Sequence, residues 1–138
     1  MEFKYQTKSE KQLRKNYSDR VRENLNDFSN FEDFLEWYNS QERFCYYCKL
    51  TEIESQELVM TGILTSNRFP QKGIIGRGTS RGVWLEVDRL NPKGKYSRTN
   101  CVLCCYFCNN DKSDVFDSAD YLKFRNNRFE FLKEKLKK

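Results

Sequence analysis

The spacing of apolar residues predicts an amphipathic helix early in the chain. Four apolar side chains recur at the i, i+3, i+4 and i+7 positions of one helix face: Phe31, Phe34, Leu35 and Tyr38. Ser29 lies just before this stripe and Glu32 lies within it, three residues later. This is the spacing of a capping box, in which each side chain accepts a hydrogen bond from the other residue's backbone N–H. We therefore predict a helix from about residue 30 to 39.

A second stripe predicts a helix from Ser118 to the end of the chain. Apolar side chains there form one stripe and a neighbouring edge: Leu122, Phe129, Leu132 and Leu136 on the stripe, and Tyr121, Phe124 and Phe131 on the edge. Such a face either packs on the protein's own core or pairs with a second copy, and we favour packing on the core. Residues 8 to 23 are polar and basic with helix-forming composition, which predicts a further helix.

β-branched and aromatic residues predict two strands in the second half of the chain. The first covers residues 83 to 87 and the second residues 100 to 104, with turn-forming residues around Pro92 between them. A short helix is expected from about residue 110 to 116. The resulting order of strand, loop, strand and helix indicates an α+β protein.

The length of 138 residues, with 33% charged and 38% hydrophobic residues, fits one globular domain. No apolar run approaches the roughly 18 residues that would span a bilayer, and the first residues lack the apolar segment of a signal peptide. We therefore expect a cytoplasmic protein. Residues 49 to 67 fit either a short helix or a strand pair, and the glycine-rich residues 69 to 82 fit a mobile loop.

Six cysteines are present, and four of them form two Cys-x-x-Cys pairs far apart in the sequence: Cys45, Cys48, Cys105 and Cys108. In a reducing compartment such pairs are typical of metal sites rather than disulfides. Each pair can aim two thiolates at one ion, so we predict one structural Zn²⁺ per chain, with a dithiol redox pair as the alternative. Cys101 and Cys104 have the same spacing, but on a strand they would point to opposite faces, which predicts buried thiols.

The net charge of +5 is distributed unevenly. Residues 67 to 112 carry nine basic and three acidic side chains, whereas residues 25 to 66 carry two and eight. Seven basic residues of this block surround the carboxylates of Glu86 and Asp88: Arg68, Lys72, Arg77, Arg81, Lys93, Lys95 and Arg98. Such a pattern is typical of a phosphate-binding surface around an acidic metal site, and scattered solvated charges are the alternative.

The region from Glu86 onward carries a specific motif. The chain contains Glu86-Val87-Asp88-Arg89-Leu90, then Tyr96-Ser97, Asn100, Cys105-x-x-Cys108-Asn109 and Lys112-Ser113. This pattern resembles the HNH, or ββα-metal, nucleases, which have an Asp-His pair at a strand end, a central Asn, and a His or Asn opening a helix. The resemblance implies a small ββα-metal nuclease core with a four-cysteine zinc knuckle and flanking N- and C-terminal helices.

The resemblance also implies roles for individual residues. Asp88 and Asn109 would bind the catalytic metal, Mg²⁺ or Mn²⁺, and Asn100 would be the central Asn that positions the general base. Lys112 would hold a neighbouring phosphate at the helix start. The chain departs from the family at Arg89, which stands where the general-base histidine is expected, and the sequence contains no histidine. An arginine, with a pKa above about 12, cannot accept a proton at neutral pH.

A restriction endonuclease within this family has the same Asp-Arg exception and is similar to this chain over about residues 31 to 118. That similarity implies that Tyr47 lies by the scissile phosphate as nucleophile or base, and that Arg89 binds this phosphate. An aromatic cover for the zinc is the other interpretation of Tyr47. Metal-activated water is the alternative mechanism, with Glu86 as a reserve base, because strand alternation places Glu86 and Asp88 on one face.

These features predict one HNH-like domain over residues 1 to 138, with a helical part over residues 1 to 40, a zinc-stapled core over 41 to 118 and a C-terminal helix over 119 to 138. We expect a Mg²⁺-dependent deoxyribonuclease that cuts double-stranded DNA at a specific site as a homodimer, without membrane contact. The alternatives are a phage or mobile-element nicking endonuclease, a catalytically lapsed zinc-stapled DNA-binding module, and a dithiol oxidoreductase.

Overall fold

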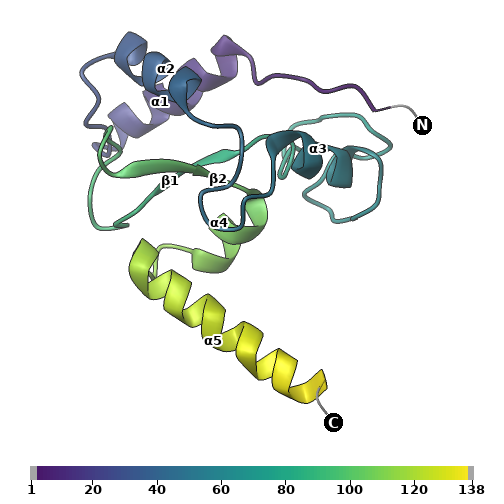
Figure 1. The fold of residues 1–138 in the computed structure, drawn as a ribbon. Helices are drawn as coiled ribbons and strands as arrows, with labels where there is room; N and C mark the ends of the chain where they lie inside the picture. The colour runs from purple at the N-terminus through teal and green to yellow at the C-terminus, as the bar shows by residue number, and fades with distance from the viewer. Residues whose placement is uncertain (1–2, 137–138) are drawn as a thin grey trace.

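The computed structural model of the chain describes residues 3 to 136, with side chains described as far as residue 127. Within this range it contains five helices and two strands: α1 Glu10–Arg22, α2 Phe31–Ser40, α3 Glu52–Met60, β1 Glu86–Arg89, β2 Cys101–Cys104, α4 Tyr106–Lys112 and α5 Ser118–Leu136. Figure 1 shows α1 and α2 on one side of the β1–β2 ribbon and α4 on the other, with α5 extending away. The predicted α+β class is confirmed.

The two strands form an antiparallel ribbon in which Glu86 pairs with Cys104 and Asp88 with Val102. β1 begins three residues later than predicted, because the backbone before it is used elsewhere: the Leu85 N–H donates to the Glu52 carboxylate at 3.0 Å. Residues 83 to 85 are nevertheless buried, so their apolar character reflects core packing rather than strand pairing.

The helix predicted from 110 to 116 is placed wrongly. α4 starts at Tyr106, because Cys105 acts as its N-cap and its sulfur accepts a hydrogen bond from the Cys108 N–H. The helix ends at Lys112, because Ser113 adopts a positive φ of 57°, which an α-helix cannot accommodate. The helix that faces β1 therefore begins four residues before the expected one.

The predicted N-terminal helices are present as α1 and α2. α1 is capped by a reciprocal pair of hydrogen bonds between Ser9 and Gln12. The capping box expected before α2 is wrong by one residue: Asn30 is the N-cap, and its Oδ1 accepts from the Asp33 N–H at 2.8 Å. The ambiguous residues 49 to 67 contain α3, so the helical alternative is the correct one there.

α5 begins at Ser118 as predicted. Tyr121 is buried against the body of the protein, whereas Leu122 and Phe124 are exposed. The remaining side chains of the predicted stripe and edge lie outside the described side chains: Phe129, Phe131, Leu132 and Leu136. None of the helices in residues 3 to 136 combines the length and the apolar character needed to cross a bilayer.

The core consists of two clusters that meet near α4. The first joins α1, α2, the sheet and the cysteine knuckles, and it is rich in aromatic contacts such as Phe34 against Trp37. The second packs α3 against Trp84 and the loop before β1. Phe107 of α4 contacts both clusters. This arrangement holds α4 against β1, which is where the candidate site lies.

Candidate functional site

Four cysteine sulfurs form a compact cluster between the first knuckle and α4. The ligand atoms of Cys45, Cys48, Cys105 and Cys108 all lie within 4.8 Å of one another. The Cys48 and Cys105 sulfurs are 3.7 Å apart. A tetrahedral ion with Zn–S bonds of about 2.3 Å places its sulfur ligands about 3.8 Å apart, so the cluster fits a structural zinc.

The backbone around this cluster is arranged to support thiolates. The Cys45 sulfur accepts from the N–H groups of Tyr47 and Cys48, at 3.4 and 3.5 Å, and the Cys105 sulfur accepts from Cys108 at 3.4 Å. Hydrogen bonds to a sulfur favour its charged form. Both knuckles therefore present sulfurs whose deprotonation on binding a metal is stabilised locally.

The other two cysteines lie outside the cluster, as predicted. Cys101 and Cys104 are buried in β2, 5% and 0% exposed. Burial raises the pKa of Cys101 to about 11 and also raises the pKa of Cys104. Both thus remain neutral thiols that fill the core.

Two carboxylates of β1 face two side chains of α4. The Asn109 amide donates to Glu86 Oε1 at 2.7 Å, and the Lys112 ammonium lies 3.4 Å from Asp88 Oδ1. Glu86 and Asp88 are two residues apart on a strand, and Asn109 and Lys112 are three residues apart on a helix. Each spacing places both side chains on the same face of its element. The predicted shared face of Glu86 and Asp88 is confirmed.

Asp88 is only 6% exposed and is hydrogen-bonded through both of its oxygens. The Tyr47 hydroxyl donates to Oδ2 at 2.9 Å, and Lys112 contacts Oδ1. Burial raises the pKa of Asp88 against the opposing effect of Lys112. Burial, followed by the nearby Asp88 charge, raises the pKa of Tyr47 well above its usual range. In this arrangement the phenol keeps its proton and acts as a hydrogen-bond donor to Asp88.

Lys112 does not occupy the surface position that the motif led us to expect. It lies in the last turn of α4 rather than at a helix start, and its side chain is 0% exposed. Its ammonium also donates to the Arg89 carbonyl at 2.9 Å. Because a buried cation needs a partner, Lys112 neutralises Asp88 and is not free to contact a phosphate.

Asn109 and Asp88, the expected metal pair, are not in contact with each other among the interactions that the described residues make. Asn109 instead contacts Glu86. Glu86 also forms a bidentate ion pair with Arg81, in which Arg81 Nε and Nη2 lie 2.9 and 3.0 Å from the two carboxylate oxygens. Glu86, Asp88 and Asn109 nevertheless gather on one face, and their oxygens are the type of donor that Mg²⁺ and Mn²⁺ prefer. The chemistry of this donor set fits a divalent cation.

Arg89 lies at the end of β1, beside the loop that leads to β2. Its Nη1 donates to the Gly94 carbonyl at 3.0 Å, and its guanidinium carbon lies 4.8 Å from the centre of the Tyr96 ring. The side chain is partly exposed. The guanidinium is therefore held in a defined, partly exposed place by the β1–β2 loop.

Asn100 holds the same loop closed. Its Nδ2 donates to the carbonyls of Asn91 and Lys95, at 3.1 and 2.9 Å, and its Oδ1 accepts from the Asn91 N–H at 3.0 Å. All three bonds are to backbone groups of the β1–β2 loop. The side chain thus shapes the loop on which Arg89 rests, and it contacts no other candidate site residue through these bonds.

The basic residues predicted around the site are mostly on the surface. Five lie in loops and are exposed or partly exposed: Arg68, Lys72, Arg77, Lys93 and Lys95. Arg98 forms ion pairs with Asp33 and Glu36 of α2, at 2.7 and 3.3 Å. Arg81 is paired with Glu86 as described above. The loop residues are available to a polyanion, whereas Arg98 already links its loop to α2.

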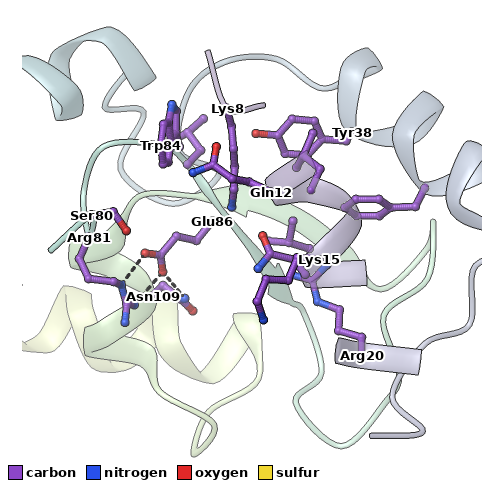
Figure 2. A pocket seen from close by; sticks show the side chains of 15 residues that line it. Lys8, Gln12, Lys15, Arg20, Tyr38, Ser80, Arg81, Trp84, Glu86 and Asn109 are labelled. Carbon is purple, nitrogen blue, oxygen red and sulfur yellow. Dashed lines mark hydrogen bonds and ion pairs between the residues drawn. The ribbon is translucent and has the colours of Figure 1, made fainter. Parts of the chain in front are cut away.

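The site also includes side chains that sequence reasoning missed. A pocket of about 380 Å³ lies beside Glu86 and Asn109, and its opposite side carries Lys8, Lys15 and Arg20 (Figure 2). The only hint of these residues in the sequence was the excess of basic over acidic side chains at positions 1 to 24, seven against four. That excess does not reveal which of them turn toward β1.

No protein-family model and no curated protein matches the sequence. Among solved structures, the chain is similar to the rare-cutting HNH restriction endonuclease PacI, which exhibits a mechanism of DNA perturbation. The two share 26% sequence identity and a TM-score of 0.59, over 82% of this chain and 71% of that one. The hairpin followed by a helix, with four clustered cysteines, corresponds to the expected ββα arrangement. The chain therefore has a small α+β, PacI-like HNH fold.

Proposed function

We propose that this chain is a metal-dependent endonuclease that hydrolyses phosphodiester bonds in double-stranded DNA. The observation that carries the proposal is the PacI-like HNH fold, in which Glu86 of β1 contacts Asn109 of α4 and pairs with Arg81, while Arg89 follows Asp88 at the end of β1. Oxygen donors suit Mg²⁺ or Mn²⁺, and guanidinium groups suit phosphate.

The proposed division of labour follows from the chemistry of each group. Asp88, Asn109 and Glu86 would hold a divalent cation, which stabilises the negative charge that develops on the phosphate. Arg89 would bind the scissile phosphate, because its guanidinium is permanently charged and presents several N–H donors in one plane. The loop held by Asn100 fixes the position of Arg89.

Two groups could handle the proton of the attacking nucleophile. Tyr47 donates to Asp88 Oδ2, so an attack by the phenolic oxygen on phosphorus would pass its proton to Asp88 and expel one deoxyribose oxygen as the leaving group. The phosphotyrosine so formed would then be hydrolysed by water. The alternative is attack by water, with Glu86 taking the proton. We favour Tyr47, because it joins the zinc knuckle directly to the buried carboxylate of β1.

Tyr47→Phe is expected to reduce the cleavage rate by at least about 100-fold, the usual contribution of a positioned proton-transfer group. The variant also leaves a buried oxygen of Asp88 without its donor, so melting temperature and DNA binding are measured beside cleavage. Tyr121→Phe is the matched control, because Tyr121 is another buried phenol that donates to a carboxylate, Asp111 at 3.0 Å. Equal cleavage rates for Tyr47→Phe and Tyr121→Phe would contradict the role of Tyr47 and favour Glu86 as the proton acceptor.

The nuclease activity itself is tested with zinc-loaded protein on supercoiled plasmid and phage-genome DNA. Discrete fragments are expected with Mg²⁺ or Mn²⁺, and no cutting with EDTA or with Zn²⁺ alone. Linear plasmid as the first product would support a homodimer in which each copy cuts one strand, as a two-fold arrangement on palindromic DNA requires. Accumulation of nicked circles would instead support a nicking endonuclease.

A second candidate is a zinc-stapled DNA-binding module without catalysis. The surroundings of Asp88 favour it: the carboxylate is buried, both of its oxygens are hydrogen-bonded, and the raised pKa of Tyr47 opposes loss of the phenolic proton. Salt-sensitive DNA binding without cleavage of any of the DNAs, at either metal, would support this candidate over the nuclease.

A further inference from the structure

A pocket between α1 and the start of β1 contains an excess of positive charge that none of the proposed catalytic roles uses. Its volume of about 380 Å³ is within the range of roughly 300 to 1,000 Å³ that is usual for ligand sites. Figure 2 shows Lys8 and Lys15 on the side of α1, with Arg81, Glu86 and Asn109 opposite them. The pocket thus opens directly beside the candidate metal ligands.

Charge in this pocket is not balanced. Four basic side chains line it, from Lys8, Lys15, Arg20 and Arg81, against the single carboxylate of Glu86. Arg81 already neutralises Glu86, and Lys15 pairs with Asp19 at 3.1 Å. Within the described part of the chain, no carboxylate lies within 4.0 Å of the charged groups of Lys8 or Arg20. These two cations therefore lack a partner of opposite charge there.

Arg20 is held rigidly while part of its guanidinium is unsatisfied. The group lies 4.4 Å from the Tyr96 ring centre and 5.6 Å from that of Phe34. Its Nη1 is buried and has no hydrogen-bond partner among the described residues. Burial lowers the pKa of both Arg20 and Lys8, as expected for cations withdrawn from water without a counter-charge. An anion with several acceptor oxygens would give Arg20 Nη1 a hydrogen-bond acceptor and would give both cations a counter-charge.

The chain just before Lys8 is anchored to the body of the protein. The Gln56 side chain, 0% exposed, bonds both backbone groups of Gln6, accepting from its N–H at 2.7 Å and donating to its carbonyl at 2.9 Å. The Trp84 indole donates to the same carbonyl at 2.9 Å. The segment before α1 is thus tied to α3 and to the start of β1, which leaves Lys8 at the rim of the pocket.

We propose that this pocket binds a phosphate group of the DNA backbone, through Lys8 and Arg20, and so extends the substrate surface onto α1. The inference rests on the proposed nuclease function for the identity of the phosphate, but it concerns residues outside the HNH motif. A backbone phosphate presents the acceptor oxygens that both cations need, and free inorganic phosphate shares this chemistry. The bound phosphate would lie beside Glu86 and Asn109 and would fix the register of the DNA over them.

The test is DNA binding by the full chain, zinc-loaded and without Mg²⁺ or Mn²⁺, measured by fluorescence anisotropy over a range of salt concentrations. Lys8→Met and Arg20→Met are expected to weaken binding about tenfold each and to reduce the salt slope by about 0.9, the value for one lost phosphate contact. Lys11→Met is the matched control, because Lys11 is exposed on α1, close in sequence to Lys8, and does not line the pocket. Because Arg20 also packs on two rings, Lys8→Met decides the outcome if Arg20→Met is poorly folded.

A thermal-melting experiment distinguishes free phosphate from the DNA backbone as the ligand of the pocket. Inorganic phosphate is compared with chloride at equal ionic strength, for wild type and Lys8→Met. A melting shift from phosphate, without any loss of DNA affinity in Lys8→Met, would overturn the proposal by assigning the pocket to free phosphate. Equal DNA affinity and salt slope for Lys8→Met and Lys11→Met would overturn it as well, whatever the cleavage assay shows. Weaker binding by Lys8→Met supports it, even for a chain that cuts nothing.

Discussion

Cys105→Ala is expected to leave the chain without zinc and largely unfolded, whereas Cys104→Ala is expected to leave it folded with one zinc. The two cysteines are neighbours in sequence and are both fully buried, so the loss of core volume is the same. Only Cys105 belongs to the four-sulfur cluster, and only Cys105 caps α4. The pair therefore isolates the contribution of the metal together with that of the α4 cap, and an N-cap is worth only about 1 kcal/mol.

The expected difference is large because of the energies involved. Structural zinc sites bind with apparent free energies of about 10 to 16 kcal/mol at neutral pH, and small domains are stable by only about 5 to 15 kcal/mol. Loss of one buried sulfur from the core removes about 1 kcal/mol. Zinc content per chain, far-UV circular dichroism and thermal melting would distinguish the variants. A folded Cys105→Ala chain that still holds one zinc would contradict the proposed ligand set.

Asp88→Asn is expected to reduce cleavage by about 1,000-fold, because it removes a charged ligand from the site where phosphate charge develops. The same change should destabilise the protein. Lys112 is completely buried beside Asp88, and removing one partner of a buried ion pair costs about 3 to 5 kcal/mol. A loss of activity in this variant alone would therefore not distinguish chemistry from folding.

The double variant Asp88→Asn with Lys112→Met separates the two effects. Replacing both charges by groups of similar size is expected to restore much of the melting temperature, because no unpaired charge remains in the interior. Cleavage should stay at the level of Asp88→Asn. Asp27→Asn, which changes a carboxylate outside the site, is the control and should cut like wild type. Recovery of cleavage in the double variant would remove Asp88 from the ligand set and leave Glu86 with Asn109.

Local features of the site could be predicted from the sequence because they depend on short-range geometry. Two residues between paired cysteines are enough to bring two sulfurs together, and strand alternation is enough to put Glu86 and Asp88 on one face. The buried state of Cys101 and Cys104 followed from the same alternation. In each case the spacing alone determines the relation between the side chains.

The features that were missed depend on contacts between distant segments. The position of β1 is set by a hydrogen bond from Leu85 to Glu52 of α3, and the start of α4 by a cysteine that caps it. Neither contact has a signature in local propensity. The burial of Lys112 depends on the packing of α4 on β1, and the basic pocket depends on Gln56 holding Gln6. Charge counts identified the basic block but not these arrangements.

The double role of Cys105 has a consequence for the order in which the two proposed metals bind. Its sulfur contributes to the four-cysteine cluster and also fixes the first turn of α4, the helix that carries Asn109 and Lys112. Until zinc is bound, the divalent ligands on β1 would have no ordered helix opposite them. Under the proposed function, loading is therefore sequential, and a newly made chain stays harmless to DNA until it has acquired zinc.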